Sequence, residues 1–135
     1  MQGLLADINI QGHLRALTGV LEGPSWREIW HSLNLPFMLF RDLSLPLNAP
    51  DALIWRTCQA HQLILLTGNR NADGADSLEA TLRTHNTSAS LPVFTIADTE
   101  QLLRSRDYAD RVVGQMLEYL LDIEQYRGTG RLFLP

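Results

Sequence analysis

The stretch Leu-Leu-Ala-Asp-Ile-Asn at residues 4–9 is an apolar run that ends at a carboxylate, Asp7, close to the start of the chain. Gly12 follows it, and the leucines then recur at helical spacing, as they do after the first strand of an α/β fold. In such folds the groups that perform chemistry lie just beyond the carboxyl ends of the strands. The position of Asp7 therefore predicts that a functional site forms around it.

Three further apolar runs have the length and composition of strands, and helical patterns separate them. The runs cover residues 36–40, 63–66 and 93–96, and residues 131–134 form either a closing strand or an extended tail. Helices are expected over residues 12–21, from 25, from about 50 to 61, over 77–84, from 98, and over 107–123. This alternation predicts an α/β fold with a mostly parallel sheet of four or five strands and helices on both faces.

The composition narrows the class of protein. The 135 residues suit one domain, expected to span residues 1–135, and the single cysteine, Cys58, excludes an internal disulfide and a cysteine metal cluster. No apolar run approaches the roughly 20 residues of a membrane helix, and the start lacks the pattern of a secretory signal. We therefore expect a cytoplasmic protein without membrane contact.

The charged residues of the chain exclude further classes of protein and of enzyme mechanism. The net charge of −4 provides no overall attraction for nucleic acid or anionic lipid, and the chain contains arginine but no lysine. A Walker P-loop, a Schiff-base enzyme and a phosphoacceptor receiver domain each need a lysine, so these mechanisms are set aside. Arginine suits phosphate because its planar fork binds two oxygens at once. Arg15, Arg70 and Arg83 are candidates for contacts with a phosphate backbone.

Acidic and amide side chains follow or approach two of the predicted strands. If the first and third strands are neighbours, these groups meet at one edge of the sheet. Carboxylates about 4 Å apart repel by roughly 1–4 kcal/mol, and a hard cation such as Mg²⁺ or Mn²⁺ relieves that repulsion. Acids also suit helix N-termini without any function, whereas a carboxylate directly after a buried strand needs a partner, either a ligand or an ion pair. The candidate metal ligands are Asp7, Asp51, Asn69, Asp73 and Asp76.

Three segments resemble, in their order and spacing, the PIN-like domain family. They are LLADIN at residues 4–9, APDALI at 49–54 and LILLTGNRN at 63–71, and the resemblance extends from residue 4 to about residue 96. The family includes the toxin nucleases of bacterial toxin–antitoxin pairs. The resemblance implies a three-layer α/β/α sandwich, an acidic cluster that binds Mg²⁺ or Mn²⁺, and cleavage of RNA by a metal-activated water.

The resemblance assigns roles residue by residue. Asp7 matches the first acid of the family pattern, and Asp51 matches the acid at the start of the middle helix. After the third strand the family carries aspartates around an arginine, where this chain has Asn69 and Asn71. An amide ligates through its carbonyl oxygen but brings no charge, so this departure bears on catalysis more than on metal binding.

Two functions are therefore held as hypotheses. The first is a divalent-metal-dependent ribonuclease, and the second is a PIN-like module that binds RNA or a protein partner without hydrolysis. The amides at Asn69 and Asn71 favour the second, and the remaining acids favour the first. An antitoxin or another small protein is the partner that the resemblance implies. For the enzyme, the catalytic residues would be Asp7, Asp51 and Asp76, with Asn69 or Asp73 completing the metal site.

The C-terminal part of the chain carries a second apolar surface. Residues 107–123 form a strongly amphipathic pattern, and residues 132–134 add a short apolar run. Both segments either complete the core or cover a partner subunit, so a homodimer is one arrangement that the sequence allows.

Overall fold

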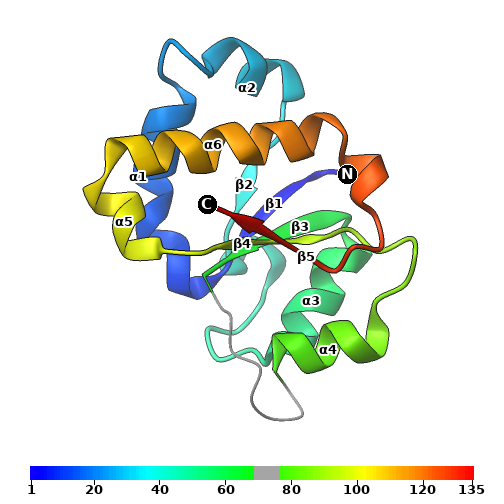
Figure 1. The fold of residues 1–135 in the computed structure, drawn as a ribbon. Coiled ribbons are helices and arrows are strands. Elements are labelled where there is room, and N and C mark those ends of the chain that lie inside the picture. The colour runs from blue at the N-terminus through cyan, green and yellow to red at the C-terminus, as the bar shows by residue number, and fades with distance from the viewer. Residues whose placement is uncertain (69–76) are drawn as a thin grey trace.

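The computed structural model describes residues 1–68 and 77–135 and contains a central sheet of five parallel strands (Figure 1). The strand order is β2-β1-β3-β4-β5, and each neighbouring pair is parallel. The strands are β1 (Gly3–Ala6), β2 (Phe37–Met38), β3 (Leu63–Thr67), β4 (Val93–Ile96) and β5 (Arg131–Leu134). The α-helices are α1 (Leu14–Leu21), α2 (Arg27–Leu33), α3 (Asp51–Ala60), α4 (Leu78–His85), α5 (Thr99–Arg104) and α6 (Arg106–Leu121). The predicted α/β fold is confirmed.

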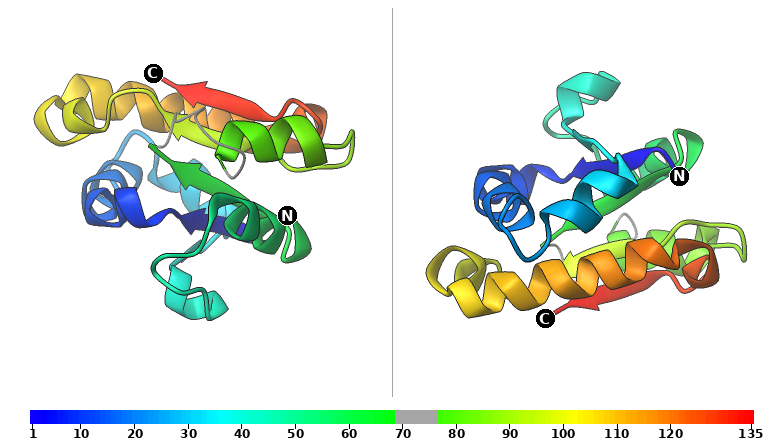
Figure 2. Two further views of the ribbon diagram at one scale, coloured as in Figure 1. Left: turned by 90° about the horizontal axis from the view of Figure 1, so that it is seen from below. Right: turned by 90° about the horizontal axis from the view of Figure 1, so that it is seen from above.

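The three central strands β1, β3 and β4 are buried on both faces, and the alternation of their side chains divides the core into two clusters. Leu4 packs with α1, α2, α5 and α6, whereas its neighbour Leu5 packs with α3 and α4. In β3, Ile64 and Leu65 divide in the same way. The result is a three-layer α/β/α sandwich, and the two views of Figure 2 look onto its two helical layers in turn. Each fully buried aliphatic side chain stabilises the fold by about 1.5–3 kcal/mol.

The order of the strands reverses between β1 and β3, which are neighbours in the sheet. The chain leaves β1 toward β2 on one side and leaves β3 toward β4 on the other, so the two connections diverge at the carboxyl ends of the strands. The register pairs Leu4 with Ile64 and Ala6 with Leu66. The expectation that the first and third strands lie side by side is therefore correct, and the divergence creates the place where ligands bind in open parallel sheets.

Two local elements differ from the prediction because polar side chains bond to the nearby backbone. A 3₁₀ helix, η1 (Ile8–His13), precedes α1, and the Asp7 side chain accepts a hydrogen bond from the first amide of η1. β2 is only two residues long because a second 3₁₀ helix, η2 (Phe40–Leu43), follows it. Asp42 accepts a 2.8 Å hydrogen bond from the amide of Leu39 and starts η2 there.

Helices α4, α5 and α6 begin at side-chain caps. Ser77 accepts a hydrogen bond from Ala80 and caps α4, and Asp98 caps α5 as predicted. Ser105 caps α6, which ends at Leu121, two residues earlier than predicted, and a third 3₁₀ helix, η3 (Ile123–Tyr126), follows. The C-terminal apolar segments largely complete the core, and residues 131–134 form the closing strand β5. Within residues 1–68 and 77–135, no helix has the length and apolar content required to cross a bilayer.

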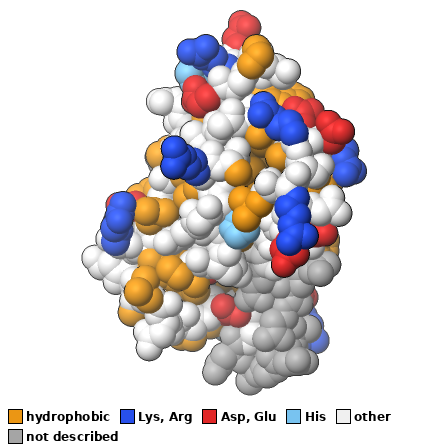
Figure 3. All heavy atoms as spheres, turned by 90° about the vertical axis from the view of Figure 1, so that its left-hand side faces the viewer, with side chains coloured by type: hydrophobic (Ala, Val, Ile, Leu, Met, Phe, Trp, Pro, Cys, Tyr) orange, Lys and Arg blue, Asp and Glu red, His pale blue; other side chains and the backbone are white. Residues whose placement is uncertain are grey.

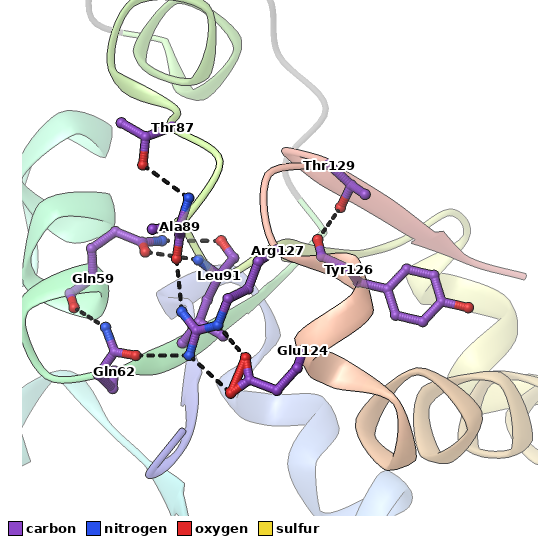
Figure 4. A network of polar contacts seen from close by, with 9 residues as sticks. All are labelled: Gln59, Gln62, Thr87, Ala89, Leu91, Glu124, Tyr126, Arg127 and Thr129. Atoms are coloured by element: carbon purple, nitrogen blue, oxygen red, sulfur yellow. Dashed lines mark hydrogen bonds and ion pairs between the residues drawn. The ribbon is translucent and has the colours of Figure 1, made fainter.

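The amino ends of β3, β4 and β5 are joined by a polar network around Arg127 (Figure 4). The Arg127 guanidinium donates to the carbonyl of Ala89 at 2.7 Å and to the side chain of Gln62 at 3.1 Å, and it pairs with Glu124. Gln59 adds two bonds to the backbone of Leu91, at 3.0 and 3.1 Å. These bonds connect the end of α3, the segment before β4 and η3. They therefore stabilise the sheet at the amino ends of its strands, opposite the end at which Asp7 lies.

Replacing Arg127 by alanine is expected to lower the free energy of unfolding by about 1–2 kcal/mol, because partly buried acceptors lose a charged donor. Urea denaturation monitored by circular dichroism measures the change. Arg104→Ala is the control, since the ion pair of Arg104 with Glu100 spans 3.7 Å between side chains that are 78% and 77% exposed. We expect that variant to stay within about 0.5 kcal/mol of the native protein. Equal losses in both variants would contradict a special role for the network.

Candidate functional site

Asp7 lies directly after β1 and is 5% exposed. Its backbone amide donates to the carbonyl of Leu66 at 2.9 Å, which attaches it to β3. One carboxylate oxygen, Oδ1, accepts from the amide of Ile8 at 2.7 Å, and the other, Oδ2, accepts from the hydroxyl of Thr67 at 2.6 Å. The carboxylate is therefore held in one orientation at the junction of two strands.

Thr67, the last residue of β3, is a site residue that was not predicted from the sequence. It is fully buried, and its hydroxyl group donates to Asp7 across the two strands. The position of Thr67 in the sequence could have indicated this role. Once β1 and β3 are paired in parallel register, Asp7 and Thr67 occupy equivalent places at the ends of their strands. A hydroxyl group at the end of an otherwise apolar strand then needs a polar partner, and the adjacent acid supplies it.

Asp51 is the first residue of α3, and its side chain is partly buried. The structure brings it within electrostatic range of Asp7. Burial is the main cause that raises the pKa of Asp7 above its usual value of 3.8; the hydrogen bonds from Thr67 and Ile8 lower that pKa, and the negative charge of Asp51 raises it further. The negative charge of one acid that was predicted from the sequence, Asp51, thus acts on the other, Asp7, at the carboxyl end of β1.

The other three candidate ligands, Asn69, Asp73 and Asp76, lie outside the described residues, as does Asn71. Among residues 1–68 and 77–135, no group of three or more histidine, cysteine or acidic side chains is arranged to hold a metal ion. The described part of the site is therefore a pair of acids with its supporting hydrogen bonds.

The Asp7 carboxylate has the properties of a ligand for a hard cation. Within residues 1–68 and 77–135, each of its oxygens accepts one hydrogen bond, and an ionised carboxylate has about four acceptor positions, so each oxygen has capacity for a further partner. Ionisation of this buried group is unfavourable, and Asp51 adds repulsion. A divalent cation bound between the two acids would offset both effects, and Mg²⁺ or Mn²⁺ accepts a small number of carboxylates because it retains several waters.

The backbone next to the acids is closely packed. The amide of Gly68 donates to the Asn9 side chain at 3.3 Å, so Gly68, directly after β3, is tied to η1. A Cβ atom at Gly68 would lie 2.7 Å from Cγ2 of Thr99, the first residue of α5, which leaves no room for a larger residue without a shift. The end of β3 is consequently in direct contact with the start of α5.

Cys58 lies on α3 and is fully buried. Burial, together with the negative charge of Asp7, raises the pKa of the Cys58 thiol to about 12. The thiol therefore stays protonated at neutral pH, and the thiolate, which is the nucleophilic form, is not populated. Cys58 is therefore a small residue of the core.

Comparison of the chain with protein-family models, with curated proteins and with solved structures finds no match. The PIN-like resemblance therefore stays a prediction, and a function has to be inferred from the geometry at the ends of β1 and β3.

The raised pKa of Asp7 predicts a specific pH dependence of stability. As pH rises from about 4, the unfolded chain loses the Asp7 proton before the folded protein does, so the folded state binds more protons and its stability falls. Asp7→Asn lacks this contribution. In EDTA, the free energy of unfolding of Asp7→Asn should therefore increase relative to that of the native protein between pH 4 and pH 7, as measured by urea denaturation at each pH.

Thr67→Val is a matched variant for this experiment, because it removes the hydroxyl donor with little change of shape. The lost bond stabilises the ionised carboxylate, so the pKa of Asp7 should rise further and the loss of stability should extend to higher pH. A difference between Asp7→Asn and the native protein that is constant over this pH range would show that Asp7 is not perturbed.

Proposed function

We propose that this protein is a divalent-metal-dependent ribonuclease of the PIN-like type, with Asp7 and Asp51 as its central metal ligands. The observation that carries the proposal is the buried, hydrogen-bonded carboxylate of Asp7 at the point where the strand order reverses, with a second acid close enough to raise its pKa. Asn69, Asp73 and Asp76 follow β3 in the sequence and are the candidates to complete the ligand set.

The main structural alternative for a buried acid is an ion pair, and the geometry at Asp7 argues against it. In the part of the chain that the structure describes, the ion pairs join other residues, and Asp7 forms none with arginine or histidine. Burying a carboxylate without an opposite charge costs several kcal/mol. A fold tolerates that cost most readily where a bound cation compensates it.

In this proposal the residues of the chain would hold the cation and orient the carboxylates that bind it. Thr67 and the amide of Ile8 fix the Asp7 carboxylate so that its free lone pairs remain available, and Asp51 supplies a second negative oxygen from the start of α3. When bound, the cation supplies an activated water and stabilises negative charge on the phosphoryl group. The close packing around the Gly68 backbone holds the end of β3 in place beside Asp7.

A second function, binding without hydrolysis, is favoured by one specific feature. The family pattern has aspartates where this chain has Asn69 and Asn71, so the negative charge expected after β3 is reduced. A site with fewer charges holds a cation more weakly and stabilises a phosphoryl transition state less. In this alternative the protein recognises RNA, or a small protein such as an antitoxin, through the same edge of the sheet.

The enzyme hypothesis predicts cleavage of labelled RNA oligonucleotides in Mn²⁺ and no cleavage in EDTA. Asp7→Asn and Asp51→Asn should each lower the initial rate by at least about a hundredfold, because each removes a charged ligand. Asp122→Asn is the matched control, since Asp122 is an exposed acid at the end of α6 and should leave the rate unchanged. Rates are read from denaturing gels. Cleavage that persists in Asp7→Asn would identify a contaminating nuclease and refute the hypothesis.

Metal binding has a readout that does not depend on activity. At a Mn²⁺ concentration about 100 times the dissociation constant, the native fold should gain about 2.7 kcal/mol, seen as a rise in melting temperature. Asp7→Asn should lose most of this rise, and Asp122→Asn should keep it. A Mn²⁺-dependent rise without RNA cleavage would favour the binding module, and equal behaviour of all three proteins would exclude a metal site at Asp7.

A further inference from the structure

A pocket of about 430 Å³ opens between α1, α5 and the start of α6, and it is lined by three arginines. The face that carries these helices is turned toward the viewer in Figure 3, where basic side chains stand among apolar ones. No acidic side chain of the described residues lines this pocket, although the whole chain has a net charge of −4. The arginines are Arg15, Arg104 and Arg106.

The three guanidinium groups come from three different helices and are available to a ligand. In residues 1–68 and 77–135, no acidic side chain forms an ion pair with Arg15 or Arg106. Arg104 pairs with Glu100, but at 3.7 Å and with both side chains largely exposed, so the pair is weak. Arg106 extends toward the residues that follow α1, because one of its terminal nitrogens lies 3.7 Å from where a Cβ atom on Gly23 would be.

Small and apolar residues form the rest of the pocket. Ala16 and Gly19 lie on the α1 side, and a Cβ atom at Gly19 would meet nothing within 4 Å, so the space there is open. Leu103 lines the opposite side and is 57% exposed. The pocket thus combines positive charge with an exposed apolar wall, which fits an anionic group attached to a less polar one, such as a phosphate with its ribose.

The pocket and the acids lie on the same side of the molecule, and α5 connects them. Thr99, at the start of α5, contacts the backbone at Gly68 after β3, and Arg104, at its end, lines the pocket. The six residues of α5 span about 9 Å at 1.5 Å per residue. A polymer bound at Asp7 would therefore reach the pocket with its next few units.

We propose that this pocket binds a backbone phosphate of an RNA strand at a distance from the bond to be cleaved. The proposal rests on the proposed ribonuclease function for the identity of the polymer, and on the arginines for the recognition. Guanidinium groups bind phosphate oxygens through paired, charge-assisted hydrogen bonds, and such backbone contacts set position rather than sequence preference. The pocket would fix the register of the strand over Asp7 and Asp51.

The test measures binding separately from cleavage. Fluorescence anisotropy of a labelled single-stranded RNA, titrated with protein in EDTA, gives a dissociation constant and its salt dependence. Arg15→Ala and Arg106→Ala should each raise the dissociation constant about tenfold, as expected for loss of one charged hydrogen-bonding contact. Each should also reduce the slope of log affinity against log salt by about 0.7.

Arg56→Ala is the matched control, because Arg56 is an exposed arginine on α3, on the opposite face of the sheet. It should bind RNA as the native protein does, and unchanged melting temperatures establish that all the variants are folded. The proposal is overturned if the pocket variants bind as tightly as Arg56→Ala, or if the native protein does not bind RNA at all.

The two proposals fail in different ways. RNA binding that depends on Arg15 and Arg106 without any Mn²⁺-dependent cleavage would support the pocket and refute the nuclease. Cleavage that depends on Asp7, with KM and RNA affinity unchanged in the pocket variants, would support the nuclease and refute the pocket.

Discussion

The hydrogen bond from the Thr67 hydroxyl to the Asp7 carboxylate is the interaction on which the candidate site depends. It joins the ends of β1 and β3 at 2.6 Å in a position from which water is largely excluded. Without this donor, the amide of Ile8 would be the one hydrogen-bond donor left to the Asp7 carboxylate among residues 1–68 and 77–135. The bond forms because the parallel register places the two residues opposite one another, so the geometry of the sheet determines the chemistry at its edge.

The amino and carboxyl ends of the parallel strands have different roles. At the amino ends of β3, β4 and β5, polar side chains such as Arg127 and Gln59 bond to neighbouring backbone groups, and Arg127 also bonds to the side chain of Gln62. At the carboxyl ends, the negative charge of Asp51 helps to raise the pKa of the buried Asp7, and α5 leads from there to the arginine-lined pocket. The burial of Asp7 near Asp51 at the carboxyl ends is unfavourable in isolation. The bonds at the amino ends and the core stabilise the fold that maintains it.

Much of the fold could be predicted from the sequence because hydrophobic periodicity determines which segments are buried. The predicted site required β1 and β3 to be neighbours, and the sheet meets that condition. Local hydrogen bonds were harder to foresee: Asp42 bonds to the amide of Leu39 and shortens β2, and Asp7 starts the 3₁₀ helix η1. Such contacts depend on the direction of single side chains, which periodicity does not specify.

The candidate site could be predicted only in part, because some of its contacts also depend on how the elements pack and on the direction of single side chains. Asp7 and Asp51 were identified from their positions relative to strands and helices, and the structure brings them within electrostatic range. The role of Thr67 depends on register, and the grouping of Arg15, Arg104 and Arg106 depends on how α1 packs against α5 and α6; neither is visible in the linear order of residues. The buried position of Asp7 has one more consequence. If a cation binds at Asp7 as proposed, a proton would compete with it for the same carboxylate oxygens, so mild acidification would favour its release.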